Sequence, residues 1–248
     1  MFKYCLSTRR TYLNKISFVI PCYNEEKYIR DCILSIKKEA KFLSHYEIIV
    51  VDNNCTDNTV LIAMQEGVTI VSERQKGVVF ARQRGYEVAQ YDLIANIDAD
   101  SRLSTDWVKI ALHYINNPNV AAVTGPLIYD DVSKSLSIST KIYYGIAWFS
   151  SKFIGVFLQG GNSLIKKSAL YLADGYDTSI AFYGEDTMTA KRLEPYGKIK
   201  FAMKLKLHSS PRRLKDQGVF STTWLYLKNY LSVTFKDRAV TSSYKDFR

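Results

Sequence analysis

Two carboxylates one residue apart, Asp98 and Asp100, follow a run of mostly apolar residues at 93–97. Carboxylate oxygens at this spacing suit a hard cation such as Mg²⁺ or Mn²⁺, which can bridge to a diphosphate and neutralise its charge as it departs. Taken alone, the pair could be a solvated acidic turn without a metal-binding role. The preceding apolar run and the later motifs favour a metal-phosphate site.

A second acidic pair, Glu185-Asp186, follows Gly184 and opens a predicted helix. A carboxylate there could remove the proton of an acceptor hydroxyl. The competing interpretation is an ordinary helix start, where acidic residues are favoured. His208 follows a predicted strand, and its imidazole could be a third metal ligand or a structural side chain.

Candidates for nucleotide binding come from three earlier segments. Tyr23, within 21–26, offers a flat ring for a nucleobase, although the segment also fits a turn before a helix. Asp52 ends a predicted buried strand, where it could bond a base N–H or shape a turn. Lys76 and Arg82 lie around a predicted helix start and could contact phosphate or a base carbonyl, or be surface charge.

Alternating strand and helix patterns position these side chains. Strands are predicted at 16–20, 48–51, 68–71 and 93–97, and helices at 29–36, 57–66 and 80–89. The alternation predicts an α/β fold with a mostly parallel sheet flanked by helices. Ligands of such sheets bind outside the carboxyl ends of the strands. The polar clusters at 21–26, 52–58 and 98–102 are therefore expected to converge on one crevice.

The second half of the chain is less regular. Helices are predicted at 107–114 and 185–193, and strands at 120–123 and 199–202. Aromatic residues gather at 142–158 and from 218 onward, with Lys228, Lys236 and Arg238 in the tail. This mixture suits peripheral attachment to an anionic membrane surface, and packing in the core is the equal alternative. The aromatic residues considered for such attachment are Tyr143, Tyr144, Trp148, Phe149, Phe153, Phe157, Phe220, Trp224, Tyr226, Tyr230 and Phe235.

Composition bounds the partners of the chain. Its 248 residues, 47% of them hydrophobic, can bury the core of one α/β domain or of two joined halves. The net charge of +10 attracts anionic partners, but many of the short basic runs, which include Arg212-Arg213, are predicted to be solvated surface. A nucleic-acid recognition motif is missing, and an acidic crevice would repel phosphates without a metal, so nucleic acid is not expected.

The cysteines and the apolar runs bear on location. None of the four cysteines forms a CxxC pair, so a zinc site is not expected and a reduced, cytoplasmic setting is favoured. No apolar run is long enough to suggest a membrane-spanning helix. We therefore expect a cytoplasmic protein. Any membrane contact is expected to be peripheral, at the inner face of the membrane.

Taken in order, these segments resemble the family 2 glycosyltransferases, which have the GT-A nucleotide-sugar-binding fold. The likeness extends from Ile16 to His208, and its specificity comes from the order and spacing of short motifs. The motifs lie at 19–25, 50–59, 76–77, 81–82, 97–100, 160–162, 184–187 and 192–193. The resemblance implies a metal-dependent, inverting transferase of hexosyl or related groups from a UDP-linked donor to an acceptor hydroxyl. It also implies a part in polysaccharide, cell-envelope or glycolipid synthesis.

The resemblance further implies a role for each matched residue. Pro21, Tyr23 and Glu25 would line the nucleoside pocket, and Asp52 would bond the base, usually a pyrimidine. Arg82 would lie near the base or diphosphate.

On the reacting side, Asp98 would lie near the ribose and the metal, and Asp100 and His208 would ligate Mn²⁺ or Mg²⁺. Asp186 would be the general base, supported by Glu185. Gly160, Gly161 and Asn162 would form the loop near the donor sugar and the acceptor. The acceptor would be a sugar or a lipid-linked acceptor.

Two motifs depart from the family pattern. The frequent Asp-Asp-Gly-Ser turn is 52–55, Asp-Asn-Asn-Cys, here, and Asn tolerates the same left-handed backbone. The frequent Gly-Gly-Phe is Asp-Gly-Tyr at 174–176, which leaves the wall of the acceptor pocket open to change.

By this resemblance one globular GT-A domain divides into four parts: an N-terminal extension at 1–15, a nucleotide-sugar-binding half at 16–130, an acceptor-binding and catalytic half at 131–212, and an aromatic and basic tail at 213–248. Two other functions compete. A sugar nucleotidyltransferase needs a glycine-rich, basic loop after its first strand, whereas 21–26 reads Pro-Cys-Tyr-Asn-Glu-Glu. A catalytically degenerate binding module is opposed by the intact Asp98, Asp100 and Asp186.

Overall fold

The computed structural model describes residues 15–130, 132, 134–153, 157–180 and 184–212, together with 225, 228–230, 232–234, 236, 238 and 240. Nearly all of the N-terminal extension lies outside these residues. So do four of the aromatic residues considered in the tail, Phe220, Trp224, Tyr226 and Phe235, and the side chain of Phe153.

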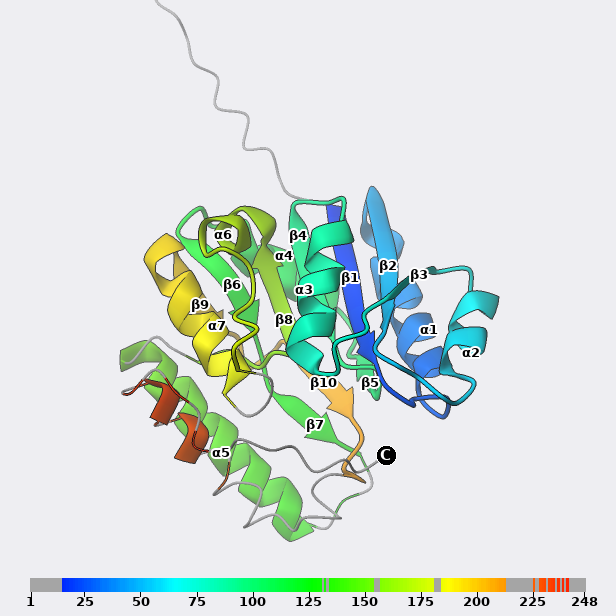
Figure 1. Ribbon diagram of the computed structural model, residues 1–248. Helices are drawn as coiled ribbons and strands as arrows, with labels where there is room; N and C mark the ends of the chain where they lie inside the picture. The colour runs from blue at the N-terminus through cyan, green and yellow to red at the C-terminus, as the bar shows by residue number, and fades with distance from the viewer. Residues whose placement is uncertain are drawn as a thin grey trace, which may run out of the picture.

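A mixed sheet of seven strands forms the centre of the described chain (Figure 1), in the order β3-β2-β1-β4-β8-β6-β9. The strands are β1 Lys15–Cys22, β2 His45–Asp52, β3 Thr69–Ser72, β4 Leu93–Ile97, β6 Val120–Thr124, β8 Asn162–Lys166 and β9 Lys198–Phe201. The first four strands are parallel, β8 is antiparallel to both of its neighbours, and β6 and β9 are parallel. The predicted α/β fold with a mostly parallel sheet is confirmed, and strands from both sides of residue 131 share that sheet.

Helices cover both faces of this sheet. The helices α1 Ile29–Glu39, α2 Thr59–Gln65 and α4 Trp107–Ile115 pack on the face that carries Phe18 and Ile20. The helices α3 Val78–Val88, α6 Lys167–Leu172 and α7 Glu185–Leu193 pack on the face that carries Val19. Successive side chains of a strand point to opposite faces, so a continuous apolar run such as that of β1 supplies two cores at once.

Short elements that sequence patterns did not predict complete the fold. A small sheet of three-residue strands joins β5 Ser101–Leu103, β10 Leu207–Ser209 and β7 Leu127–Tyr129, in that order. Strands this short show no periodicity. The strand β8 was not predicted because it begins with the polar residues Asn162-Ser163. Two short 3₁₀ turns lie at Ala40–Phe42 and Glu194–Tyr196.

The long helix α5, Lys134–Phe153, lies beside the small sheet at the lower end of the molecule in Figure 1. Tyr144 is buried, and its ring stacks on Phe201 at 6.3 Å. Phe157 contacts both Phe201 and Tyr230. By contrast, Phe149 on α5 is 60% exposed. The aromatic residues of the second half therefore divide between core and surface.

Within the residues that the structure describes, none of the helices combines the length and the apolar character needed to cross a bilayer.

Candidate active site

The carboxyl ends of β1, β2 and β4 lie side by side, because β1 pairs in parallel with both neighbours. β1 and β2 stay in register through Pro21 opposite Val51 to Cys22 opposite Asp52. Asp98 follows β4 directly. The three polar segments predicted to converge therefore start from adjacent strand ends at one edge of the sheet.

A ring, an ammonium group and a carboxylate gather at the ends of β1 and β2. The Nζ of Lys76 lies 4.0 Å from the centre of the Tyr23 ring. Asp52 accepts the backbone N–H of Cys55 through Oδ1 at 2.8 Å. The turn between them passes through Asn54 with φ 71°, so the left-handed backbone expected from the Asn substitution is confirmed.

Asn53 fixes the segment that carries Lys76, a role that sequence reasoning missed. Its buried side chain donates to the carbonyl oxygens of Glu73, at 2.9 Å, and Gln75, at 2.7 Å. Its Oδ1 accepts the N–H of Gly77 at 2.7 Å. In sequence this Asn looks like one more turn residue, because its partners lie more than one element away.

The buried guanidinium of Arg82, on α3, joins three predicted functional carboxylates. Its Nη1 lies 2.8 Å from Oδ1 of Asp186 and 3.9 Å from Oε1 of Glu185, and its Nη2 lies 3.3 Å from Oδ1 of Asp98. We call these four residues the Arg82 cluster. The sequence placed Arg82 near the base or diphosphate; the structure places it between the first carboxylate of the metal pair and the predicted general base.

The neighbouring carboxylates keep Arg82 positively charged despite its burial. Burial by itself lowers the pKa of this guanidinium, but the carboxylates of Asp186, Asp98 and Glu185 outweigh burial and raise the pKa above its ordinary value. A permanent, planar cation thus holds Asp98 and Asp186 in one geometry.

Two glycines let the backbone approach this cluster. The N–H of Gly160 donates to Oδ2 of Asp186 at 2.8 Å. A Cβ on Gly160 would lie 1.9 Å from Oδ1 of Asp186, and a Cβ on Gly161 would lie 1.9 Å from Oδ2 of Asp98. Any side chain at either position would displace a carboxylate, so the loop has to be glycine here.

Asn162 belongs to the same predicted loop but faces the core. Its Oδ1 accepts the indole N–H of Trp107 at 2.8 Å, and its Nδ2 donates to the carbonyl oxygens of Leu205, at 2.9 Å, and Pro126, at 3.2 Å. The structure therefore brings Gly160 and Gly161 to the carboxylates, while the Asn162 side chain anchors the loop from beneath.

A second arginine, Arg212, joins the other two acidic candidates. Its Nη2 bonds Oε1 of the buried Glu25 and lies 3.3 Å from Oδ2 of Asp100. We call these three residues the Arg212 cluster. Burial lowers the pKa of Arg212, but its bond with Glu25 and the charge of Asp100 raise it above the ordinary value. Arg212 is therefore not one of the solvated basic residues expected among the short runs, and its partners lie far back in the chain.

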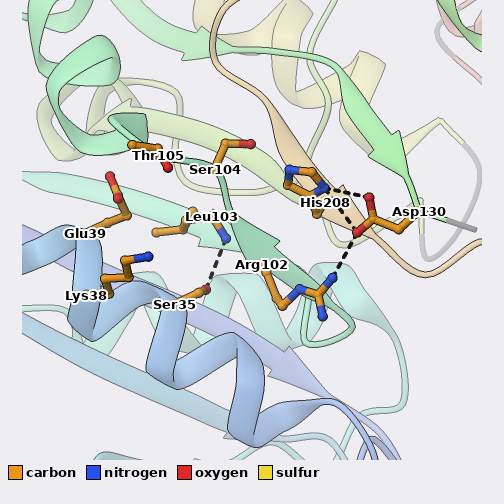
Figure 2. A pocket seen from close by; sticks show the side chains of 9 residues that line it. All are labelled: Ser35, Lys38, Glu39, Arg102, Leu103, Ser104, Thr105, Asp130 and His208. Atoms are coloured by element: carbon orange, nitrogen blue, oxygen red, sulfur yellow. Dashed lines mark hydrogen bonds and ion pairs between the residues drawn. The ribbon is translucent and has the colours of Figure 1, made fainter.

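His208 lies beside this region but faces the other way. Neighbouring residues of β10 point to opposite faces, so Ser209 turns its hydroxyl toward Oδ1 of Asp100, at 3.4 Å, while His208 turns away. The Nδ1 of His208 lies 2.9 Å from Oδ1 of Asp130, which also pairs with Arg102 in a pocket against α1 (Figure 2). Metal ligation by His208 stays a prediction, and its imidazole is oriented away from Asp100.

The donor set fits a divalent cation that arrives with phosphate. In the described part of the chain, no three His, Cys, Asp or Glu side chains converge as a metal group. Asp98 and Asp100 nevertheless offer hard oxygens, and each already faces a cationic group, from Arg82 and Arg212 respectively. Mg²⁺ at nucleotide sites commonly takes one or two carboxylates and completes its shell from phosphates and water. Asp98 and Asp100 are the residues that would hold such an ion.

Solved structures share this fold. A mannosyltransferase from Pyrobaculum calidifontis in complex with GDP-Man and Mn²⁺ superposes with a TM-score of 0.71 at 18% identity, over 92% of this chain and 65% of that one. Glucosyl-3-phosphoglycerate synthase from Mycobacterium tuberculosis, with Mn²⁺, UDP-glucose and phosphoglyceric acid, superposes with a TM-score of 0.62 at 20% identity, over 89% and 80% of the two chains. The fold is therefore that of the GT-A glycosyltransferases, as the sequence predicted.

Sequence comparison gives the same result. The glucosyl-dolichyl phosphate glucuronosyltransferase of Haloferax volcanii is 25% identical over 191 residues, which are 71% of this chain and 60% of that protein. The chain spans about half the length of the curated relatives it matches, from 38% to 60%. The family model "Glycosyl transferase family 2" matches residues 17–172. This chain belongs to glycosyl transferase family 2.

Proposed function

We propose that this chain transfers a sugar from a UDP-linked donor to an acceptor hydroxyl with inversion, using Mg²⁺ or Mn²⁺. The Arg82 cluster is the observation that carries the proposal. It joins a carboxylate that can serve the donor, Asp98, to one that can serve the acceptor, Asp186, through a single guanidinium. A site for in-line displacement needs such a fixed relation between the leaving and the attacking groups.

The donor nucleotide is proposed from the ends of β1 and β2. Tyr23 offers a ring face for a base, and Asp52 offers a carboxylate for the N–H of uracil. Solved proteins of this fold bind either GDP-Man or UDP-glucose, so the fold itself leaves the base open. The similarity of the segment around Asp52 to pyrimidine-binding members of the family supports UDP.

In the proposed reaction Asp186 accepts the proton of the acceptor hydroxyl as its oxygen attacks the anomeric carbon. The bond from that carbon to the diphosphate oxygen breaks, and its electron pair leaves with the diphosphate. Arg82 and the N–H of Gly160 hold the Asp186 carboxylate in place, at 2.8 Å each. A divalent cation, when bound to Asp98 and Asp100, supplies charge neutralisation for the leaving group.

The acceptor is proposed to be a lipid-linked sugar or a growing cell-envelope polysaccharide. One relative of this chain acts on a glucosyl-dolichyl phosphate, which is a lipid-linked sugar. A lipid-linked acceptor would bring the chain to a membrane surface, and the basic net charge of +10 favours an anionic one.

The test of this function is the substitution Asp186→Asn. It keeps the shape of the side chain and removes the base, so transfer should fall by about 10²–10⁴-fold while UDP binding stays within about twofold. Turnover would be followed by UDP release with Mn²⁺ and a panel of UDP-sugars, and binding by calorimetry. Glu194→Gln, an exposed acid just after the same helix, is the matched control. Turnover by Asp186→Asn equal to the control would overturn the role of the base.

A further inference from the structure

Helix α5 exposes a row of large apolar side chains. Ile138, Ile142 and Phe149 have exposed fractions of 57%, 59% and 60%. They are separated by four and then seven residues, so at about 3.6 residues per turn they lie on one side of the helix. Tyr144 and Ala147, which face the core, lie on the other side. We call Ile138, Ile142 and Phe149 the α5 stripe.

Positive charge borders the α5 stripe and negative charge is missing from the helix. The helix contains three lysines and no aspartate or glutamate in its 20 residues. Two of these lysines, Lys134 and Lys141, have exposed side chains. Trp148 is 37% exposed next to Phe149, and Trp favours the boundary between headgroups and acyl chains. An apolar row edged by lysines matches the chemistry of helices that lie on anionic membranes.

The position of α5 fits an acceptor delivered from a membrane. The helix lies at the end of the molecule that holds the small sheet β5-β10-β7 (Figure 1). That sheet begins directly after Asp100, and the Gly160 loop follows α5 in the chain. A membrane touching α5 would therefore lie on the same end of the molecule as the small sheet that follows Asp100.

We propose that the α5 stripe docks this chain onto an anionic membrane surface, with the helix lying flat among the headgroups. The apolar side chains enter the headgroup boundary, and Lys134 and Lys141 contact anionic headgroups. Only the statement that a lipid-linked acceptor would be met at this surface rests on the proposed function. Docking itself does not require transfer.

The experiment compares vesicle binding by the full chain and two double variants. Ile142→Glu with Phe149→Glu places two charges in the α5 stripe. Leu61→Glu with Met64→Glu is the matched control, because both of those side chains are exposed, at 55% and 56%, on the unrelated helix α2. Sedimentation would be measured with phosphatidylcholine vesicles, with and without phosphatidylglycerol.

We expect the unaltered chain and the α2 variant to sediment with the anionic vesicles only, and the α5 variant to bind at least about tenfold more weakly. Donor hydrolysis in solution should be equal in all three proteins. Three results would overturn the proposal: no binding by the unaltered chain, equal binding by the α5 variant, or equal binding to vesicles without phosphatidylglycerol.

Two further readouts separate this proposal from its alternatives. Light scattering on a sizing column would detect self-association; a dimer that only the α5 variant disrupts would assign the stripe to a second copy of the chain and overturn membrane docking. If vesicle binding follows expectation while no UDP-sugar is hydrolysed or transferred, the proposed function fails and the docking surface stands.

Discussion

The Arg82 and Arg212 clusters each use one guanidinium to neutralise carboxylates, but the two arginines differ in burial and in the element that carries them. In each, one guanidinium joins acidic residues from two separate segments. Arg82 is 5% exposed and rises from a helix packed against β1, so it belongs to the scaffold. The side chain of Arg212 is 23% exposed and follows the short strand β10. Arg82 therefore fixes two partly exposed carboxylates from the interior, whereas Arg212 is anchored by the buried Glu25 and lies beside Asp100 at the rim.

The largest effect is expected from Arg82→Gln. Glutamine leaves Asp98 and Asp186 facing each other without a cation, so we expect turnover to fall by at least about 10²-fold. Loss of one partner from a buried ion pair costs about 3–5 kcal/mol, and we expect the lower end because the side chains of Asp98 and Asp186 are 36% and 26% exposed. Urea unfolding and UDP release would measure the two effects.

Its matched control is Arg84→Gln on the same helix, since Arg84 pairs only at the surface with Glu87. Such pairs contribute about 0.5 kcal/mol or less. Arg82→Lys should recover part of the stability but little of the turnover, because an ammonium group lacks the planar fork that spans two carboxylates. Equal stability and turnover of Arg82→Gln and Arg84→Gln would show that Arg82 does not set the geometry of the site.

The geometry can also be disturbed without removing any charge, by Gly160→Ala. The added Cβ would lie 1.9 Å from Oδ1 of Asp186 and 2.3 Å from Nη1 of Arg82, so both groups must shift. A displacement of about 1 Å at a reacting group costs about 10²-fold in rate, while the nucleoside contacts at Tyr23 and Asp52 should be kept. Kinetics with saturating donor and calorimetry with UDP would separate the two quantities.

Gly145→Ala is the control for this substitution, because among the described atoms nothing lies within 4 Å of its added Cβ on α5. Unchanged turnover in Gly160→Ala would mean that the carboxylate position is not critical, contrary to the rigid role assigned to the Arg82 cluster.

Sequence patterns predicted the scaffold of the site better than its charge pairing. The apolar runs that became β1, β2 and β4 located Asp52 and Asp98 at strand ends, because burial on both faces leaves a continuous apolar signal. Asp186 lies 104 residues ahead of its partner Arg82 in the chain, and Glu25 lies 187 residues before its partner Arg212. No local pattern encodes such pairs. The three-residue strand that turns His208 away from Asp100 is also too short to show a periodic pattern.

The smallest effect we expect, and the one most specific to the Arg212 cluster, follows from Arg212→Gln. The guanidinium lies 3.3 Å from Oδ2 of Asp100, so it competes with any cation for that carboxylate. Removing a charge at this distance changes an interaction of about 1 kcal/mol in water and up to about 4 kcal/mol near a protein surface. Because Arg212 also bonds the closer Glu25, which neutralises part of its charge, we expect the lower part of that range, which is about tenfold tighter binding of Mn²⁺ without nucleotide. Arg30→Gln, which removes the same charge from a surface pair with Glu66, should leave Mn²⁺ affinity unchanged in the same titration. Weaker or equal Mn²⁺ binding by Arg212→Gln would mean that Arg212 holds Asp100 in place for the ion, and the two clusters would then share one role.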